Sequence, residues 1–155
     1  DWQKTENSRA MKITIMDRDD GEEDEIIVRC RQMDEQLLKM IYALKAGTEK
    51  LTVMREGSIL QVLPKDIYYF EAVDNRVFCY LEKEVLETKR KLYEVERQFA
   101  GTDFFRASKS TIINLAKVKS LSPSFHGRFD AHMKNGESLV VSRQYVPVLK
   151  QKLGL

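Results

Sequence analysis

The sequence predicts an α+β protein whose C-terminal region is predominantly β, with several small antiparallel sheets and short helices, preceded by a β-β-α segment. Three observations predict this class. Near the N-terminus two runs alternate apolar and polar residues, as strands do, and a stretch with helical periodicity follows them. Beyond residue 47, short β-forming runs alternate with turn residues. Two later stretches have the spacing of short amphipathic helices.

The length and composition fit one domain of ordinary size, or a compact domain with a small appendage. The chain has 155 residues, 43% of them hydrophobic and 32% charged, which is enough for a packed core under a solvated surface. No apolar run approaches the roughly 20 residues that cross a bilayer. Cys30 and Cys79 lack metal-ligand spacing, so we expect reduced thiols in a cytoplasmic protein. We expect residues 1–10 to be a polar tail or an expression remnant, with Met11 as the natural start.

The segment 11–47 is expected to form two strands, over residues 11–16 and 25–31, and then a helix that ends at Gly47. Between the strands, residues 17–25 hold seven acidic residues and one basic residue, which predicts a solvated loop. Their spacing does not match a calcium-binding EF-hand loop. The helix is expected to bury one stripe, formed by Met33, Leu37, Met40, Ile41 and Leu44. We consider this segment a candidate for dimer or partner contact, or alternatively a lid on the β-region.

The β-region, residues 48–155, is expected to contain short strands joined by tight turns. The strands before residue 104 are predicted over 50–55, 59–63, 67–73, 77–82 and 85–86, and those after residue 114 over 118–121, 128–133 and 139–141. The clearest turns are Asp74-Asn75-Arg76 and Asn135-Gly136. One helix, capped by Thr88 and ended by Gly101, buries Leu92, Val95 and Phe99. A second helix begins near Val146, because Pro147 is tolerated only in a first turn.

Residues 104–114 form the stretch around which the β-region is organised. Apolar residues lead in and out of it, and four polar or basic residues lie between them with no acidic one: Arg106, Ser108, Lys109 and Ser110. In an extended chain one face would hold the core while the other presents cations and hydrogen-bond donors. Such a face suits phosphates and base edges. An ordinary half-buried strand with a solvated polar face is the alternative.

The charge is distributed unevenly along the chain. From residue 104 onward nine basic residues stand against two acidic ones, a net charge of +7, so the first 103 residues carry −5 of the total of +2. This asymmetry indicates a polyanion-binding face at the C-terminal end, although scattered lysines also serve solubility alone.

An ordered set of motifs in residues 50–153 resembles the LytTR DNA-binding domain of bacterial transcription regulators. The motifs are Ile67-Tyr68-Tyr69-Phe70-Glu71, Phe104-Phe105-Arg106-Ala107-Ser108-Lys109-Ser110, Ile113-Asn114, Asn135-Gly136 and Val141-Ser142-Arg143. The resemblance implies an elongated fold of small sheets that presents loops, rather than a recognition helix, to successive major grooves. It also implies base contacts from Asn75 or Arg76, from Lys109 and from Arg143.

The chemistry of these positions fits that role. Arg143 can present two parallel donors to guanine, and Lys109 offers a single charge to a base or a phosphate. Arg106, Ser108 and Ser110 complete the predicted DNA-contacting set. A structural role is the alternative for each, for example carbonyl contacts near the final helix for Arg143. The family commonly has His followed by Arg or Asn before the motif serine, where this chain has Ser108-Lys109, so the recognised bases cannot be carried over.

Many relatives also carry a receiver domain with a phosphoacceptor aspartate. The segment ahead of the β-region is too short for a doubly wound domain of roughly 100 residues. The resemblance therefore implies the short, stand-alone type of regulator, without control by phosphorylation. Relatives of that type are often governed by a membrane protein, which suggests such a regulator for this chain by family analogy.

The predicted function is sequence-specific binding of double-stranded promoter DNA by a transcription regulator that acts as a homodimer on paired half-sites. The alternative is a protein-interaction module that acts through the acidic loop 17–25 without direct DNA binding. We do not expect an enzyme, a metal or a cofactor. His126 and His132, six residues apart in a strand-like stretch, are expected on one side of it without an obvious third ligand. We expect surface or phosphate-contacting histidines rather than metal ligands. No nucleophile-elbow, Walker or dinucleotide motif occurs.

Overall fold

The computed structural model describes residues 11–155. The expected tail, residues 1–10, lies outside the described residues. The chain divides into two units between Gln32 and Met33. The helix expected in the segment 11–47 thus belongs to the same unit as the β-region.

Residues 11–32 contain no β-strand, so the prediction of strands over 11–16 and 25–31 is wrong. All of these residues are exposed, including Ile13 and Ile15 at 86% and 91%. An isolated two-stranded hairpin is at best marginally stable, because it needs a surface that covers its apolar face. The acidic loop contains a turn at Asp20-Gly21, where the Glu22 amide donates a hydrogen bond of 3.2 Å to the Asp19 carbonyl, and an ion pair of 2.6 Å between Arg18 Nε and Asp24 Oδ1.

The first helix of the second unit is α2, Glu35–Thr48. It begins where the Asp34 carboxylate accepts a hydrogen bond of 2.7 Å from the Leu37 amide, an N-cap contact that satisfies one free donor of the first turn. The helix continues past Gly47, where it was expected to end, and Glu49 is the C-cap. Of the stripe expected to be buried, Leu37 and Ile41 are partly covered, whereas Met33, Met40 and Leu44 are exposed.

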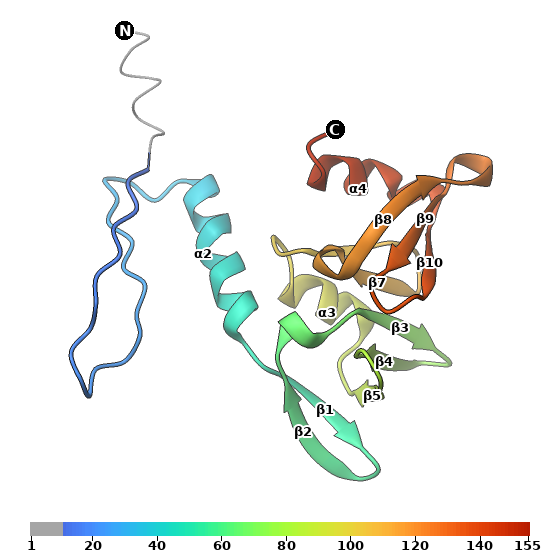
Figure 1. The fold of residues 1–155 in the computed structure, drawn as a ribbon, viewed down its shortest axis with the longest axis horizontal. Helices are drawn as coiled ribbons and strands as arrows, with labels where there is room; N and C mark the ends of the chain where they lie inside the picture. The colour runs from blue at the N-terminus through green and yellow to red at the C-terminus, as the bar shows by residue number, and fades with distance from the viewer. Residues whose placement is uncertain (1–10) are drawn as a thin grey trace, which may run out of the picture. The chain divides into compact units, whose positions relative to one another are not determined.

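Seven short strands form one antiparallel sheet in the order β2-β1-β5-β4-β3-β7-β6 (Figure 1). Their bounds are β1 Leu51–Arg55, β2 Ser58–Val62, β3 Tyr69–Val73, β4 Arg76–Tyr80, β5 Val85–Thr88, β6 Phe104–Arg106 and β7 Thr111–Asn114. The turn between β3 and β4 is tight, with Asp74 and Asn75 at φ values of 51° and 64°. Aspartate and asparagine tolerate this left-handed backbone better than other side chains do, as the sequence predicted for this turn.

A second antiparallel sheet has the order β10-β9-β8, with β8 Val118–Pro123, β9 Phe129–Met133 and β10 Ser138–Val141. The helix α3, Leu92–Gln98, precedes β6, and α4, Val146–Lys152, closes the chain with Pro147 in its first turn. Four short 3₁₀ turns complete the unit: η1 Pro64–Asp66, η2 Leu115–Lys117, η3 Phe125–Gly127 and η4 Arg143–Tyr145. The predicted class, α+β with a dominant β-region, is confirmed.

Two local predictions need correction. Residues 104–114 are not one extended run but the hairpin of β6 and β7, because residues 108–110 form a turn. Thr88 does not cap α3. It is the buried last residue of β5 and pairs with Val77, while Lys91 is the residue that precedes the helix.

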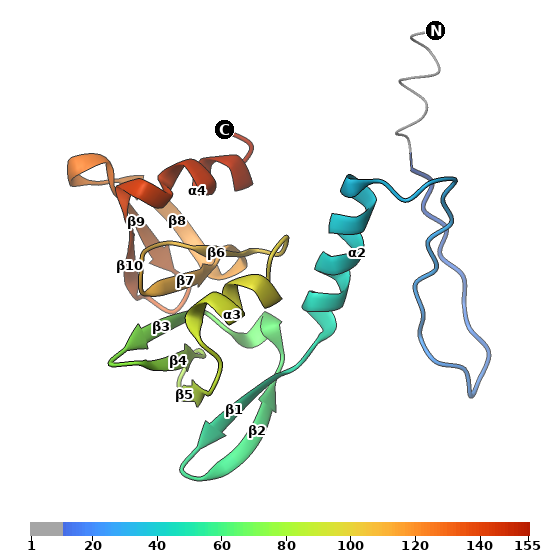
Figure 2. The same ribbon diagram turned by 180° about the vertical axis from the view of Figure 1, so that it is seen from behind.

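The core consists of two clusters on opposite faces of β3, β7 and β6. Adjacent residues of these strands alternate between them: Phe70, Phe104 and Ile112 belong to one cluster, and Tyr69, Phe105 and Ile113 belong to the other. This alternation follows from the period of two in a strand. The first cluster includes the apolar residues of α3, which lies against β6 and β7 (Figure 2). The second includes residues of β9, β10 and α4, so the three-stranded sheet covers the other face.

A polar contact also joins the two sheets. The Tyr69 hydroxyl of β3 donates a hydrogen bond of 2.7 Å to the carboxylate of Glu137, in the turn between β9 and β10. Burial and the neighbouring Glu137 raise the pKa of Tyr69, so its hydroxyl remains a donor at neutral pH. This contact fixes the position of the three-stranded sheet relative to the seven-stranded sheet. The loop at the end of β10 and the loop between β6 and β7 therefore extend from two sheets that are packed together.

Candidate nucleic-acid interface

The end of β10 is tied to the β6–β7 hairpin through one buried carbonyl. The backbone amide and the side-chain hydroxyl of Ser142 both donate to the carbonyl oxygen of Ala107, at 2.9 and 3.1 Å. Ala107 is fully buried. Because Arg143 follows Ser142 and the turn 108–110 follows Ala107, this double contact brings two distant parts of the sequence together.

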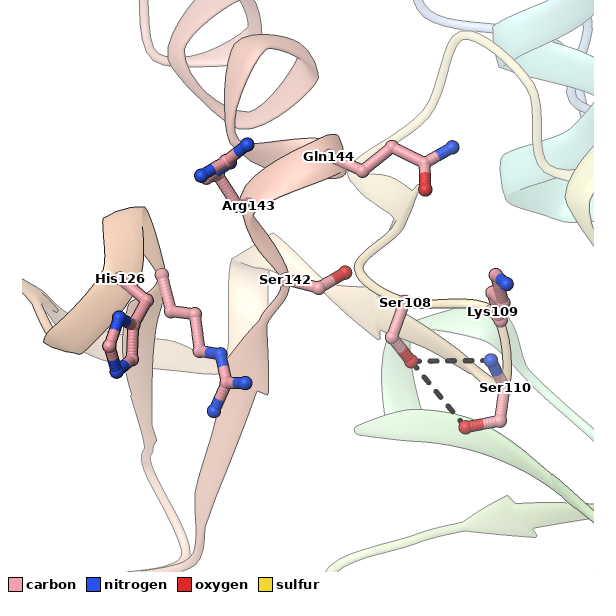
Figure 3. Close-up of a pocket in the computed structure, with 8 residues that line it drawn as sticks. Ser108, Lys109, Ser110, His126, Ser142, Arg143 and Gln144 are labelled. Atoms are coloured by element: carbon pink, nitrogen blue, oxygen red, sulfur yellow. Dashed lines mark hydrogen bonds between the residues drawn. The ribbon is translucent and has the colours of Figure 1, made fainter.

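The turn between β6 and β7 is shaped by short-range hydrogen bonds. The Ser108 hydroxyl accepts a bond of 3.2 Å from the Ser110 amide and lies 3.5 Å from the Ser110 hydroxyl (Figure 3). On the other side, Arg106 donates a bond of 2.9 Å to the Lys109 carbonyl. The turn is therefore held by its own side chains, and the Lys109 side chain remains exposed at its tip.

These loops border an open cleft of about 580 Å³, which we call the basic cleft. Its lining residues come from the β6–β7 turn, the β8–β9 turn and the start of η4: Ser108, Lys109, Ser110, His126, Arg128, Ser142, Arg143 and Gln144. Figure 3 shows the side chains of Lys109 and Ser108 across from that of His126, with Ser142 between them. Of the described residues that line the cleft, three are Lys or Arg and none is acidic. The cleft can therefore hold an anion without displacing an internal ion pair.

The structure brings four of the predicted site residues to this cleft: Ser108, Lys109, Ser110 and Arg143. Arg106 does not line it. Its side chain is only 16% exposed, and besides the Lys109 carbonyl it contacts the Glu96 carboxylate at 3.3 Å. Arg106 thus stabilises the turn through the Lys109 carbonyl, and its positive charge is paired with the Glu96 carboxylate.

The turn with Asn75 and Arg76 is not among the segments that line the cleft. However, β3, the strand that precedes this turn, is hydrogen-bonded to the β6–β7 turn, which does line it. The Ala72 amide, near the end of β3, donates a hydrogen bond of 2.8 Å to the Ser110 carbonyl. Arg76 itself binds the Glu87 carboxylate through two nitrogens, at 2.9 and 2.6 Å. This pairing raises the pKa of Arg76 and lowers that of Glu87. Asn75 is exposed at the tip of the turn.

Three lining residues, His126, Arg128 and Gln144, lie outside the predicted DNA-contacting set. His126 was expected in a strand together with His132, but the chain leaves the strand at η3, where His126 has φ +59°. His132 lies in β9 instead and contacts the hydroxyls of Ser122 and Ser138, both at 3.2 Å. The available signal was Gly127, since glycine between polar residues indicates a turn rather than a strand.

Three further observations concern metal binding, membrane insertion and thiol chemistry in the described part of the chain. Among residues 11–155 no group of three or more His, Cys, Asp and Glu side chains is placed to hold a metal ion. No helix of these residues is long and apolar enough to span a bilayer. Cys79 is fully buried, and burial raises the pKa of its thiol to about 12, so this side chain is a poor nucleophile.

A cationic cleft formed by loops, with no acidic residue in its described lining, suits contact with the phosphates and base edges of a nucleic acid. Comparison with protein families identifies the domain. Residues 57–154 match the LytTr DNA-binding domain, and the chain belongs to this LytTR family.

Individual relatives agree with this family. The chain is 29% identical to the sensory transduction protein LytT of Enterococcus faecalis and 31% identical to LytT of Bacillus subtilis, each over 70% of this chain and 45% of the relative. The chain thus spans less than half the length of these relatives. An uncharacterized HTH-type transcriptional regulator of Staphylococcus aureus is 24% identical over 94% of this chain and 99% of its own length. A solved LytTr DNA-binding domain of a Bacillus cereus response regulator superposes with a TM-score of 0.66 and 28% identity, over 70% of this chain and all of that chain.

Proposed function

We propose that this protein is a bacterial transcription regulator that binds promoter DNA sequence-specifically by placing the loops of its basic cleft in the major groove. The observation that carries the proposal is the convergence of Lys109 and Arg143 on one cleft whose described lining has no acidic residue. Membership in a DNA-binding family supports it independently.

The two cations have different expected partners. The guanidinium of Arg143 can donate two parallel hydrogen bonds to the O6 and N7 atoms of guanine, the commonest specific contact in the major groove. Lys109, a point charge at the tip of its turn, suits a guanine edge or a phosphate oxygen. Ser108 and Ser110 add hydroxyl donors beside it, and Arg106 positions the turn through the Lys109 carbonyl.

In the β3–β4 turn we assign the base contact to Asn75 rather than to Arg76. The Arg76 guanidinium is engaged by Glu87 and lies 5.3 Å from the centroid of the Phe78 ring, so its donors are largely used within the domain. Asn75 is exposed, and an asparagine amide can pair with the N6 and N7 atoms of adenine.

The proposal is tested by the salt dependence of DNA binding. The whole chain would be titrated onto a duplex selected from a random library and onto a shuffled duplex, at several salt concentrations. We expect a steep linear fall of log affinity with log salt, with a slope that reflects about 6–10 phosphate contacts, as for typical regulators. We also expect tighter binding to the selected duplex. An affinity that is absent or independent of salt would contradict the proposal and would favour a protein-interaction module acting through residues 17–25.

We further propose that the protein acts in the cytoplasm. We also propose that it binds paired half-sites as a homodimer, since one small module rarely supplies enough specificity for a genome. The exposed apolar residues of α2, among them Leu38, Met40 and Leu44, are the candidate contact for a second copy or for a membrane-protein regulator. Sedimentation of the chain with and without the selected duplex measures the stoichiometry. A single copy on each duplex would contradict the dimer.

A further inference from the structure

The turn between β8 and β9, residues 125–128, borders the basic cleft but lies outside the predicted DNA-contacting set, and the proposed function gives it no role. It is closed at both ends by backbone hydrogen bonds: the Arg128 amide donates to the Phe125 carbonyl at 3.2 Å, and the Ser124 amide donates to the Arg128 carbonyl at 2.8 Å. The turn is therefore a defined structure at the end of two paired strands, with Pro123 opposite Phe129.

Gly127 packs directly against the side chain of Arg143. A Cβ atom at this position would lie 2.8 Å from Cδ and 2.9 Å from Cγ of Arg143, closer than carbon atoms can approach. The backbone of Gly127 is also left-handed, with φ +75°, which a residue with a side chain adopts at a cost. A side chain at position 127 would force the Arg143 side chain to shift, so glycine preserves the contact of the turn with the aliphatic part of Arg143, and this contact limits where the guanidinium can point.

The neighbours of Gly127 carry the chemistry of a DNA contact. His126 and Arg128 both line the basic cleft, and neither has an acidic partner among the described residues. Phe125 is 83% exposed, so packing within the domain does not account for an aromatic residue there. An exposed ring beside cations can pack on a deoxyribose or a thymine methyl group, while Arg128 neutralises a phosphate.

We propose that the β8–β9 turn is a further DNA-contacting element. In this turn Gly127 positions Arg143 for base contact. Arg128, with His126 and Phe125 beside it, contacts the adjacent sugar-phosphate backbone of the DNA. The inference rests on the proposed function, because it assigns a role within the same cleft. It adds a fourth loop to the three that the family resemblance implies.

Single variants of the whole chain separate the two roles of this turn. Arg128→Ala removes a phosphate contact, so we expect affinity for selected and shuffled duplexes to fall by a similar factor, about three- to tenfold, and the salt slope to fall by about 1. Gly127→Ala leaves the charge unchanged, so we expect loss of preference for the selected duplex with an unchanged salt slope. Arg90→Ala, the same change as Arg128→Ala at an exposed residue outside the basic cleft, should bind like the wild type.

A double-mutant cycle tests the positioning role. If Gly127 acts through Arg143, Gly127→Ala should have no further effect on binding in an Arg143→Ala background. The proposal applies to a wild type that binds DNA with steep salt dependence. It would be overturned if, under that condition, Arg128→Ala and Gly127→Ala both bound the two duplexes as the wild type does. That result would leave the proposed function standing. A wild type without salt-sensitive DNA affinity would instead refute the proposed function and this inference together.

Discussion

Simultaneous replacement of Lys109 and Arg143 by alanine is expected to remove most of the difference in affinity between a selected duplex and a shuffled one. Each single replacement should cost about 1–3 kcal/mol on the selected site, because it removes a contact to a base edge. The two side chains come from different turns, so their effects should be roughly additive, about 2–6 kcal/mol together. The gap between specific and non-specific binding is typically about 4–10 kcal/mol, so the double variant would lose most of its discrimination.

A matched control separates this specific loss from the loss of two positive charges. Lys89 and Arg90 are exposed and line a different pocket, beside β1 and β2, and their double replacement by alanine changes the net charge equally. We expect this control to retain the preference for the selected duplex, measured by fluorescence anisotropy on both duplexes. If the two double variants lost affinity equally, the site assignment would be wrong and binding would depend only on total charge.

The largest expected effect on stability comes from Phe70→Ala. Phe70 is fully buried at the centre of the first core cluster, with ring centroids 6.0 Å from Phe99 and 5.8 Å from Phe104. Truncation of such a side chain removes apolar burial and leaves a cavity between β3, α3 and β6, which costs about 3–5 kcal/mol. Since domains of this size are stable by only about 5–15 kcal/mol, the variant should lose much of its stability.

Urea unfolding measures this loss, and Phe125→Ala is the matched control. Phe125 undergoes the same chemical change but is 83% exposed in the β8–β9 turn, so its replacement should alter the free energy of unfolding by less than about 0.5 kcal/mol. If Phe70→Ala also altered the free energy of unfolding by less than about 0.5 kcal/mol, Phe70 would not lie in a packed core and the two-cluster description of the fold would be wrong.

Much of the β-region could be predicted from local patterns. The strands around Phe70 and Val77, and the tight turn between them, follow from β-forming runs and from the tolerance of Asn75 for a left-handed backbone. The pattern over 11–16 also alternates, yet it forms no strand, because alternation indicates a strand only where another surface covers the apolar face. That surface is a property of the tertiary structure and is not visible in the local sequence.

The candidate site could be predicted only in part, because it too depends on tertiary structure. The resemblance to the LytTR domain indicated Lys109 and Arg143 as DNA-contacting cations, but the contact through Ser142 that brings them together depends on the packing of the two sheets. The pairing of Arg76 with Glu87 depends on the register of β4 and β5, in which Phe78 lies opposite Glu87. The contribution of Arg128 depends on where β8 ends. Long-range register and strand ends are the features that local patterns specify least.

The most direct test of the central claim is to map the DNA-binding surface by NMR. The chain of 18.1 kDa, labelled with ¹⁵N, would be titrated with the selected duplex, and amide shifts would be followed residue by residue. We predict the largest changes in residues 108–110, 125–128 and 142–144, which border the basic cleft, and little change in the turn at Glu56-Gly57 between β1 and β2. Shifts concentrated in β1, β2 or α2, with the cleft unaffected by the duplex, would contradict the account.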